Sequence, residues 1–285
     1  SNAPDVALHT FKVFTDDQTS YTSWYLDALN YDMVVKLHII NVSIGGPDWS
    51  DKPFVHKFRE LVGQGVIIIC AHGNAGPDYG TANNPGDEHW SIAVGGHTDD
   101  FKIAHFQSRG HTMQEKPFGY GRIKPDVVAY GHQVSSLRME RGCKEASGTS
   151  VASPVAAGIA ALVASSVPES EWHYKLTPAS MKQVLQEGAE RLPRESIYIQ
   201  GPGKANLHKS FEAMQRYEPK VTVFPGSIDL LDQDYMWPLS KTPLYATAMP
   251  LIMNLTITNG LGAHGYFEKE PEFTATNKLG EALDV

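Results

Sequence analysis

The sequence is poor in cysteine, has no surplus of positive charge and lacks a long apolar run. Two cysteines among 285 residues provide neither a disulfide framework nor the spacing of a zinc site. The 24 lysines and arginines are outnumbered by 32 acidic residues, and the net charge of -8 argues against a nucleic-acid or anionic-membrane partner. No stretch contains the roughly 20 apolar residues that a membrane-spanning helix needs. The composition is that of a globular chain that is long enough to bury a sizeable core.

Short apolar runs alternate with helical patterns between residue 4 and about residue 215. We expect strands at residues 8–14, 38–46, 65–71 and 91–96, and helices at 21–36, 53–64, 150–166, 177–192 and 205–217. Strands that are apolar almost throughout are typical of a parallel sheet covered by helices on both faces. The sequence therefore predicts an α/β fold whose glycine-rich strand ends meet at the carboxyl edge of the sheet, where such folds bind ligands.

The pattern changes near Lys220, where apolar and polar residues begin to alternate. The segments KVTVFPGSIDLL (220–231) and LIMNLTITNG (251–260) both favour antiparallel strands. We expect a domain boundary near residue 215, with residues 216–285 forming the beginning of a β-rich domain that is cut off at Val285. Residues 1–3 resemble the remnant of an expression tag and take no part in the fold.

One segment, ASGTSVASPVAAGIAAL (146–162), places small and polar residues at the start of an apolar helix. A serine in the first turn, such as Ser150, lies in the positive field of the helix N-terminus. Small neighbours, among them Gly148 and Ala152, leave room for another backbone to approach. Ser150 could also be a simple helix cap, and the Ser-Gly-Thr-Ser motif taken alone favours that interpretation.

The longer string SGTSVASPVAAG (147–158) resembles the nucleophile motif of the subtilisin-like serine proteases, or subtilases. This resemblance implies a three-layer α/β/α fold in which Ser150 attacks the scissile carbonyl of a protein or peptide substrate. AHGNAGP (71–77) is similar to the oxyanion-hole loop of the family, which implies that the Asn74 amide and the backbone N–H of Ser150 stabilise the tetrahedral intermediate. Outside this context, an asparagine between small residues is a common turn residue.

A third segment, NVSIGGP (41–47), resembles the strand with which the family pairs the substrate backbone. The resemblance implies six substrate-binding residues: Ser43, Ile44, Gly45, Gly46, Asp48 and Gly73. The carboxylate of Asp48 is a candidate partner for a basic P4 residue, and the alternative is a solvated loop carboxylate. FQSRG (106–110) and KPDVVAYG (124–131) match further family motifs, so the resemblance covers residues 4–215, the C-terminal portion of a catalytic domain.

Within the family, the sequence is most similar to the site-1 protease branch. The likeness lies in SYTSWYLDALNY (20–31), YGTANNPGD (79–87), GYGRIKPD (119–126) and YMWP (235–238). It implies a membrane-anchored enzyme in the lumen of the endoplasmic reticulum or Golgi that cleaves precursor proteins. It also implies cleavage after varied residues, with a basic residue at P4 and a branched aliphatic residue at P2.

The family motifs of the catalytic base and acid are not found in these 285 residues. There is no His-Gly-Thr helix start, and His72 belongs to the oxyanion-hole loop. PDVALHTFKVF (4–14) resembles the family segment just after the helix of the catalytic histidine, so we expect the chain to start downstream of both the base and the acid. We then expect it to be inactive alone and to self-associate through the surface that the missing part would cover.

Two other functions compete with this interpretation. A pseudoprotease or binding module would share the fold, although the presence of Ser150 and Asn74 argues against it. An α/β-hydrolase requires a Gly-x-Ser-x-Gly elbow, and the residues around Ser150 do not fit it. No cofactor is evident. Calcium is common in the family, but no loop has the density of acidic residues that this cation needs.

Overall fold

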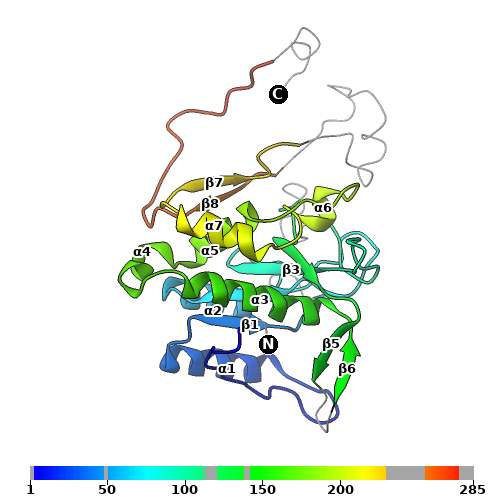
Figure 1. Ribbon diagram of the computed structural model, residues 1–285. Helices are drawn as coiled ribbons and strands as arrows, with labels where there is room; N and C mark the ends of the chain where they lie inside the picture. Colours follow the sequence, from blue (N-terminus) through cyan, green and yellow to red (C-terminus); the bar gives the residue numbers. More distant parts are fainter. Residues whose placement is uncertain are drawn as a thin grey trace.

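The computed structural model describes residues 3–47, 51–110, 112, 121–137, 142–228 and 254–275. Its centre is a four-stranded parallel sheet in the order β1-β2-β3-β4, and the α/β prediction is confirmed. The strands are β1 (Ile39–Val42), β2 (Ile67–Ala71), β3 (Ser91–His97) and β4 (Val127–Tyr130). The three predicted runs at 38–46, 65–71 and 91–96 are thus neighbours in one sheet (Figure 1).

The side chains of β2 alternate between two apolar layers. Ile67 and Ile69 face the long helix α3 (Thr149–Ser165), together with α5 (Pro178–Glu187) and α7 (Leu207–Gln215). Ile68 and Cys70 face α1 (Thr22–Val35) and α2 (Lys52–Gly63) on the opposite side. Because both faces of the sheet are covered, its strands are apolar throughout, and the architecture has the three expected layers.

Helix α3 crosses the middle of the sheet (Figure 1). Ala152, Ala156 and Ala160 recur every four residues and are fully buried against the strands. Small side chains at this spacing let the helix axis approach the sheet closely. The same packing explains why the start of the helix, and with it Ser150, is held firmly at the carboxyl edge of the sheet.

The smaller elements surround this core. They are the hairpin β5 (Val134–Leu137) with β6 (Cys143–Ala146), the short helices η1 (Glu169–Glu171), α4 (Trp172–Lys175) and α6 (Ile197–Gln200), and the antiparallel pair β7 (Val221–Phe224) with β8 (Thr256–Asn259). The β7–β8 pair lies beyond α5 and α7, where Gln183 donates to the carbonyl oxygens of Lys220 and Thr258. Antiparallel pairing after Lys220 agrees with the prediction.

The predicted strand at residues 8–14 is wrong. This run is mostly exposed, and within the described part of the chain no strand pairs with it. A strand is stable only when a neighbour satisfies its backbone groups, so an apolar pattern alone does not produce one. In the described residues no single helix is long and apolar enough to cross a membrane. Only α3 taken with the segment Glu169–Lys175, bent by 101°, meets that test by length and composition.

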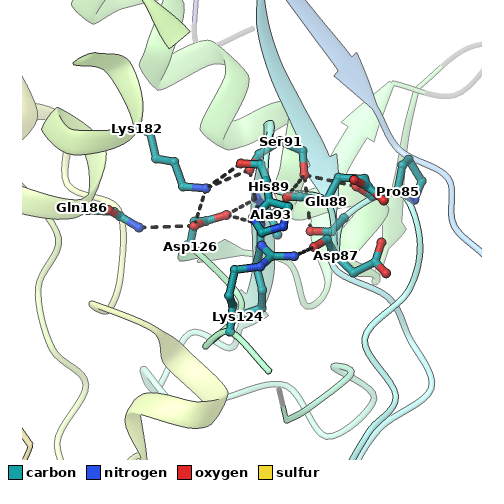
Figure 2. Close-up of polar contacts among 12 residues, drawn as sticks. Pro85, Asp87, Glu88, His89, Ser91, Ala93, Lys124, Asp126, Lys182 and Gln186 are labelled. Carbon is teal, nitrogen blue, oxygen red and sulfur yellow. Dashed lines mark hydrogen bonds and ion pairs between the residues drawn. The ribbon is translucent and has the colours of Figure 1, made fainter. Parts of the chain in front are cut away.

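A buried ionic cluster lies at the start of β3 and β4 (Figure 2). Asp126 pairs with Lys124 at 2.6 Å and with Lys182 of α5 at 2.9 Å, and its Oδ2 also accepts from the N–H of Ala93. Both ammonium groups donate to the carbonyl oxygen of Ser91. The cluster therefore joins the start of β3 to the start of β4 and to α5.

The charges of this cluster stabilise one another. Burial raises the pKa of Asp126, but the ammonium groups of Lys124 and Lys182 outweigh that effect and hold it well below its usual range. Burial lowers the pKa of Lys124 to about 8, opposed by its attraction to Asp126. At neutral pH the carboxylate of Asp126 is therefore ionised.

Candidate active site

A cavity of about 340 Å³ opens at the carboxyl edge of the sheet. Its lining comes from three regions of the chain that are far apart in the sequence: Ser43, Ile44 and Gly45; Ala71, Gly73, Asn74, Ala75 and Asn83; and Thr149 and Ser150. The cavity thus brings together six of the eight residues singled out in the sequence. Gly46 lies beside it, and Asp48 lies outside the described residues.

Ser150 is the second residue of α3 and is partly exposed to the cavity. Gly148 precedes the helix with φ +154°, a conformation that residues with a side chain rarely adopt. The point where a Cβ of Gly148 would stand is 2.9 Å from Ser150 Oγ, 3.4 Å from Asn74 Nδ2 and 3.7 Å from Ser150 N. The hydroxyl and two N–H donors therefore surround a space that only glycine leaves empty.

Thr149 fixes the orientation of the Asn74 carboxamide. Its backbone N–H and its hydroxyl both donate to Asn74 Oδ1, at 2.8 and 2.9 Å. Because Oδ1 is occupied by these donors, Nδ2 is the end that faces Ser150. Thr149 Oγ1 also accepts from the N–H of Gly73 at 3.0 Å, so this buried threonine holds two successive residues of the loop.

The wall formed by Ser43, Ile44 and Gly45 continues from β1 and is tied to its surroundings at both ends. Ser43 Oγ lies 2.8 Å from Ser153 Oγ of α3. Gly46 and Asn84 exchange two backbone hydrogen bonds of 2.9 Å each. The segment is therefore held in place along the cavity at both of its ends.

Asn83 also lines the cavity, and the sequence motifs did not identify it as a site residue. Its Cβ lies 2.9 Å from the point where a Cβ of Gly45 would stand, and its Cγ lies 2.8 Å from the equivalent point at Gly73. The two glycines therefore make room for this side chain between the two walls. The only sequence signal was the absence of a side chain at positions 45 and 73.

No histidine or carboxylate is among the described residues that line the cavity. His72, next to the loop, is fully buried, and neither ring nitrogen has a hydrogen-bond partner among the described residues. Burial lowers its pKa to about 3, with a further contribution from Lys124, so the ring is neutral. The sequence predicts that His72 is not the catalytic base. A neutral imidazole that does not line the cavity is in keeping with that expectation, and the assignment stays a prediction.

Neither cysteine nor acidic residues form a metal centre in the described chain. Across those residues, there is no group of three or more histidine, cysteine, aspartate or glutamate side chains that could hold an ion. Cys70 is buried and Cys143 is exposed, and both are free thiols.

Comparisons with known proteins agree with the family resemblance that the sequence motifs indicate. Residues 2–211 match the family model described as Subtilase family, and residues 224–285 match the model of the third Ig-like domain of MBTPS1. The chain is 48% identical over 283 residues to the subtilisin-like protease SBT6.1 of Arabidopsis thaliana, covering 99% of this chain and 27% of that protein. It is 48% identical over 271 residues to the membrane-bound transcription factor site-1 protease of Mus musculus, covering 95% of this chain and 26% of that protein.

The chain therefore spans about a quarter of the length of these curated relatives. Among solved structures, sphericase superposes with a TM-score of 0.61 at 24% identity, covering 72% of this chain and 69% of that one. At that identity the superposition is evidence for the fold alone. The domain boundary near residue 215 stays a prediction.

Proposed function

Because the chain belongs to the subtilase family of serine endopeptidases, we propose that it carries the nucleophile and oxyanion donors of a site-1-protease-like enzyme. The observation that supports this proposal most directly is the convergence of Ser150 Oγ, Ser150 N–H and Asn74 Nδ2 around one empty space. A nucleophile and two donors within reach of the same point is the geometry that acyl transfer requires.

In the proposed reaction, Ser150 Oγ attacks the scissile carbonyl carbon and its proton passes to an imidazole base. The carbonyl oxygen becomes an oxyanion that accepts from Asn74 Nδ2 and Ser150 N–H. The imidazolium then protonates the leaving amine, the C–N bond breaks, and water hydrolyses the remaining acyl-enzyme by the reverse proton transfers. Loss of one oxyanion donor costs about 10²–10³ in kcat, a figure that comes from subtilisin itself.

We place the base and its orienting acid in residues outside 1–285. The composition of the described cavity lining supports this assignment, since it offers a nucleophile and donors but no group that could accept the proton. A serine hydroxyl is a poor nucleophile at neutral pH without such a base. Residues 1–285 alone are therefore proposed to be inactive.

The substrate backbone is proposed to pair with Ser43, Ile44, Gly45 and Gly46, with Gly73 on the opposite wall of the cleft. The substrates would be precursor proteins in the lumen of the secretory pathway, with a basic P4 residue and an aliphatic P2 residue. Asp48 is the proposed partner of the P4 residue. Comparison of P4-Arg and P4-Ala peptides with the full-length protein and its Asp48→Asn variant tests this role, and an unchanged preference for arginine would remove Asp48 from the site.

Labelling with a fluorophosphonate probe tests the proposal as a whole. Residues 1–285 should stay unlabelled, whereas the longer protein with the upstream aspartate and histidine should be labelled at Ser150, and its Ser150→Ala variant should not. If the longer protein also stays unlabelled, a pseudoprotease with a subtilase fold is the better description. Rapid, stoichiometric labelling of residues 1–285 would show that a base is present within them.

A further inference from the structure

The loop that carries Asn74 is tied along its length to a second segment. We call residues 73–76 the oxyanion loop and residues 106–108 the strap. Ser108 N–H donates to the Gly73 carbonyl at 3.0 Å, and Gly76 N–H donates to the Phe106 carbonyl at 2.9 Å. The Ser108 hydroxyl accepts from the N–H of Ala75 at 3.1 Å. Ser108 therefore bonds to the residues on both sides of Asn74.

The strap is itself anchored in the core. Gln107 is fully buried, its Oε1 accepts from Gly96 N–H at 2.7 Å, and its Nε2 donates to the Ile199 carbonyl at 2.5 Å. Its N–H donates to the Ala104 carbonyl at 3.0 Å. These contacts connect the strap to β3 and α6, so it offers the oxyanion loop a rigid support.

The fit between strap and loop is tight. Ser108 is fully buried, and its Oγ lies 2.5 Å from the point where a Cβ of Gly73 would stand. A Cβ on Gly76 would overlap the Gln107 carbonyl oxygen. Gly73 is thus required by the closeness of the Ser108 side chain and Gly76 by that of the strap backbone, and movement of the loop toward the strap is blocked.

We propose that Ser108 is a positioning residue that sets the place of the Asn74 carboxamide, an inference that rests on the proposed function. Asn74 itself is exposed, and two contacts fix it: Thr149 binds its Oδ1 from the helix side, and Ser108 holds its neighbours from the opposite side. Without the Ser108 hydroxyl, Ala75 N–H loses its acceptor. The loop then gains the freedom to move Nδ2 away from the position in which it meets the oxyanion.

Loss of the Ser108 hydroxyl should weaken stabilisation of the transition state and not binding of the substrate. The strap does not line the cavity, and the substrate wall of Ser43, Ile44 and Gly45 is tied to α3 and Asn84 instead. On the opposite wall, Ser108 bonds to Gly73 through its backbone N–H, which Ser108→Ala keeps. Misplacement of a catalytic group by about 1 Å costs as much as 10²-fold in rate. Ser108→Ala should therefore lower kcat by about 10- to 100-fold and leave KM within about twofold.

The experiment compares Ser108→Ala with Ser180→Ala in the longer, active protein. Ser180 is equally buried, and its hydroxyl accepts from the N–H of Thr177 and donates to the Lys175 carbonyl, but it belongs to the capping box of α5, away from the cavity. A peptide boronate mimics the tetrahedral intermediate. Ser108→Ala should weaken the binding of this inhibitor by the same factor by which it lowers kcat. Ser180→Ala should lower the melting temperature alone. An unchanged kcat and boronate affinity in Ser108→Ala would overturn the proposal.

Hydrogen exchange provides a readout that does not depend on activity. The amide of Ala75 should exchange faster in Ser108→Ala than in the parent protein, and at the parent rate in Ser180→Ala. Ser108→Cys, which keeps a weaker acceptor, should give intermediate kcat and exchange. If even the parent protein fails to cleave peptides, the proposed function fails, and unchanged exchange at Ala75 would separately overturn the role of Ser108.

Discussion

Under the proposed function, the cavity holds the P1 residue of the substrate, and Asn83 is the side chain that we expect to select it. It fills the space between Gly45 and Gly73, and its carboxamide is uncharged. Asn83→Gly should deepen the cavity and raise kcat/KM for a P1-Phe peptide relative to a P1-Leu peptide by about tenfold. The measurement is a P1 peptide series on the full-length protein.

The isosteric Asn83→Asp variant is the matched control. It keeps the volume of the side chain and adds a negative charge, so it should favour P1-Lys without improving P1-Phe. If neither variant changes the order of preference among P1 residues, Asn83 does not contact the P1 side chain.

His72 should make the chain sensitive to acid. Burial lowers its folded pKa to about 3, whereas an unfolded histidine titrates near its ordinary value of about 6.5. The unfolded chain therefore binds a proton that the folded chain excludes, and stability falls as the pH drops from about 6.5 toward 3. Between pH 7 and pH 4.5 this residue should cost roughly 2–3 kcal/mol of unfolding free energy.

Urea unfolding of residues 1–285 and of His72→Ala across this pH range measures the effect. The variant should lose less stability on acidification, whatever its stability at pH 7. Replacement of the exposed His56 provides the control for the loss of one histidine at the surface. Equal slopes for the parent chain and His72→Ala would contradict the assignment of a buried neutral imidazole.

At the scale of elements, Asp126 lies just before β4 and joins it to β3 and α5. Asp126→Asn keeps the shape of the side chain but leaves the ammonium groups of Lys124 and Lys182 buried without a counter-charge. Removal of one member of a buried charged cluster costs about 3–5 kcal/mol. Denaturant unfolding should show that loss.

The surface pair of Lys102 with Asp100 provides the comparison. Both side chains are largely exposed, so Asp100→Asn should have little effect on stability. If Asp126→Asn lowered the free energy of unfolding as little as Asp100→Asn does, water would have to reach the cluster. The packing of the three elements would then not depend on the carboxylate of Asp126.

The whole molecule exposes an unusual amount of apolar surface around α1. Leu8 is 82% exposed, Val34 76% and Tyr31 53%, and a second cavity of about 490 Å³ lies between residues 10–13 and α1. In the described residues, β1 has a neighbour on one side only. Surfaces and edges of this kind favour association.

Residues 1–285 should therefore self-associate in a concentration-dependent manner. Light scattering coupled to size exclusion should give a mass above that of one chain, and Leu8→Glu with Val34→Glu should shift it toward the monomer. Leu137→Glu, on the exposed hairpin, is the control for a general gain in solubility. A monomer at all concentrations would refute self-association.

The sequence by itself determined the fold class, three of the four strands of the sheet (β1, β2 and β3) and the position of Ser150 in the first turn of α3. Each of these depends on a local pattern: apolar runs, glycine-rich strand ends, or small residues at the start of a helix. The run at 8–14 shows the limit of that reasoning, since it has the pattern of a strand but, among the described residues, no neighbour to pair with.

Only the tertiary structure decided which side chains meet around the cavity. The residue pairs Asn74–Thr149, Asn83–Gly45 and Ala75–Ser108 lie tens of residues apart in the sequence, and nothing in the local sequence fixes their contact. The burial of His72 is of the same kind, because it depends on the layers packed around β2. Such contacts are set by the order of strands in the sheet and by the packing of α3 across it, which bring distant loops to one edge.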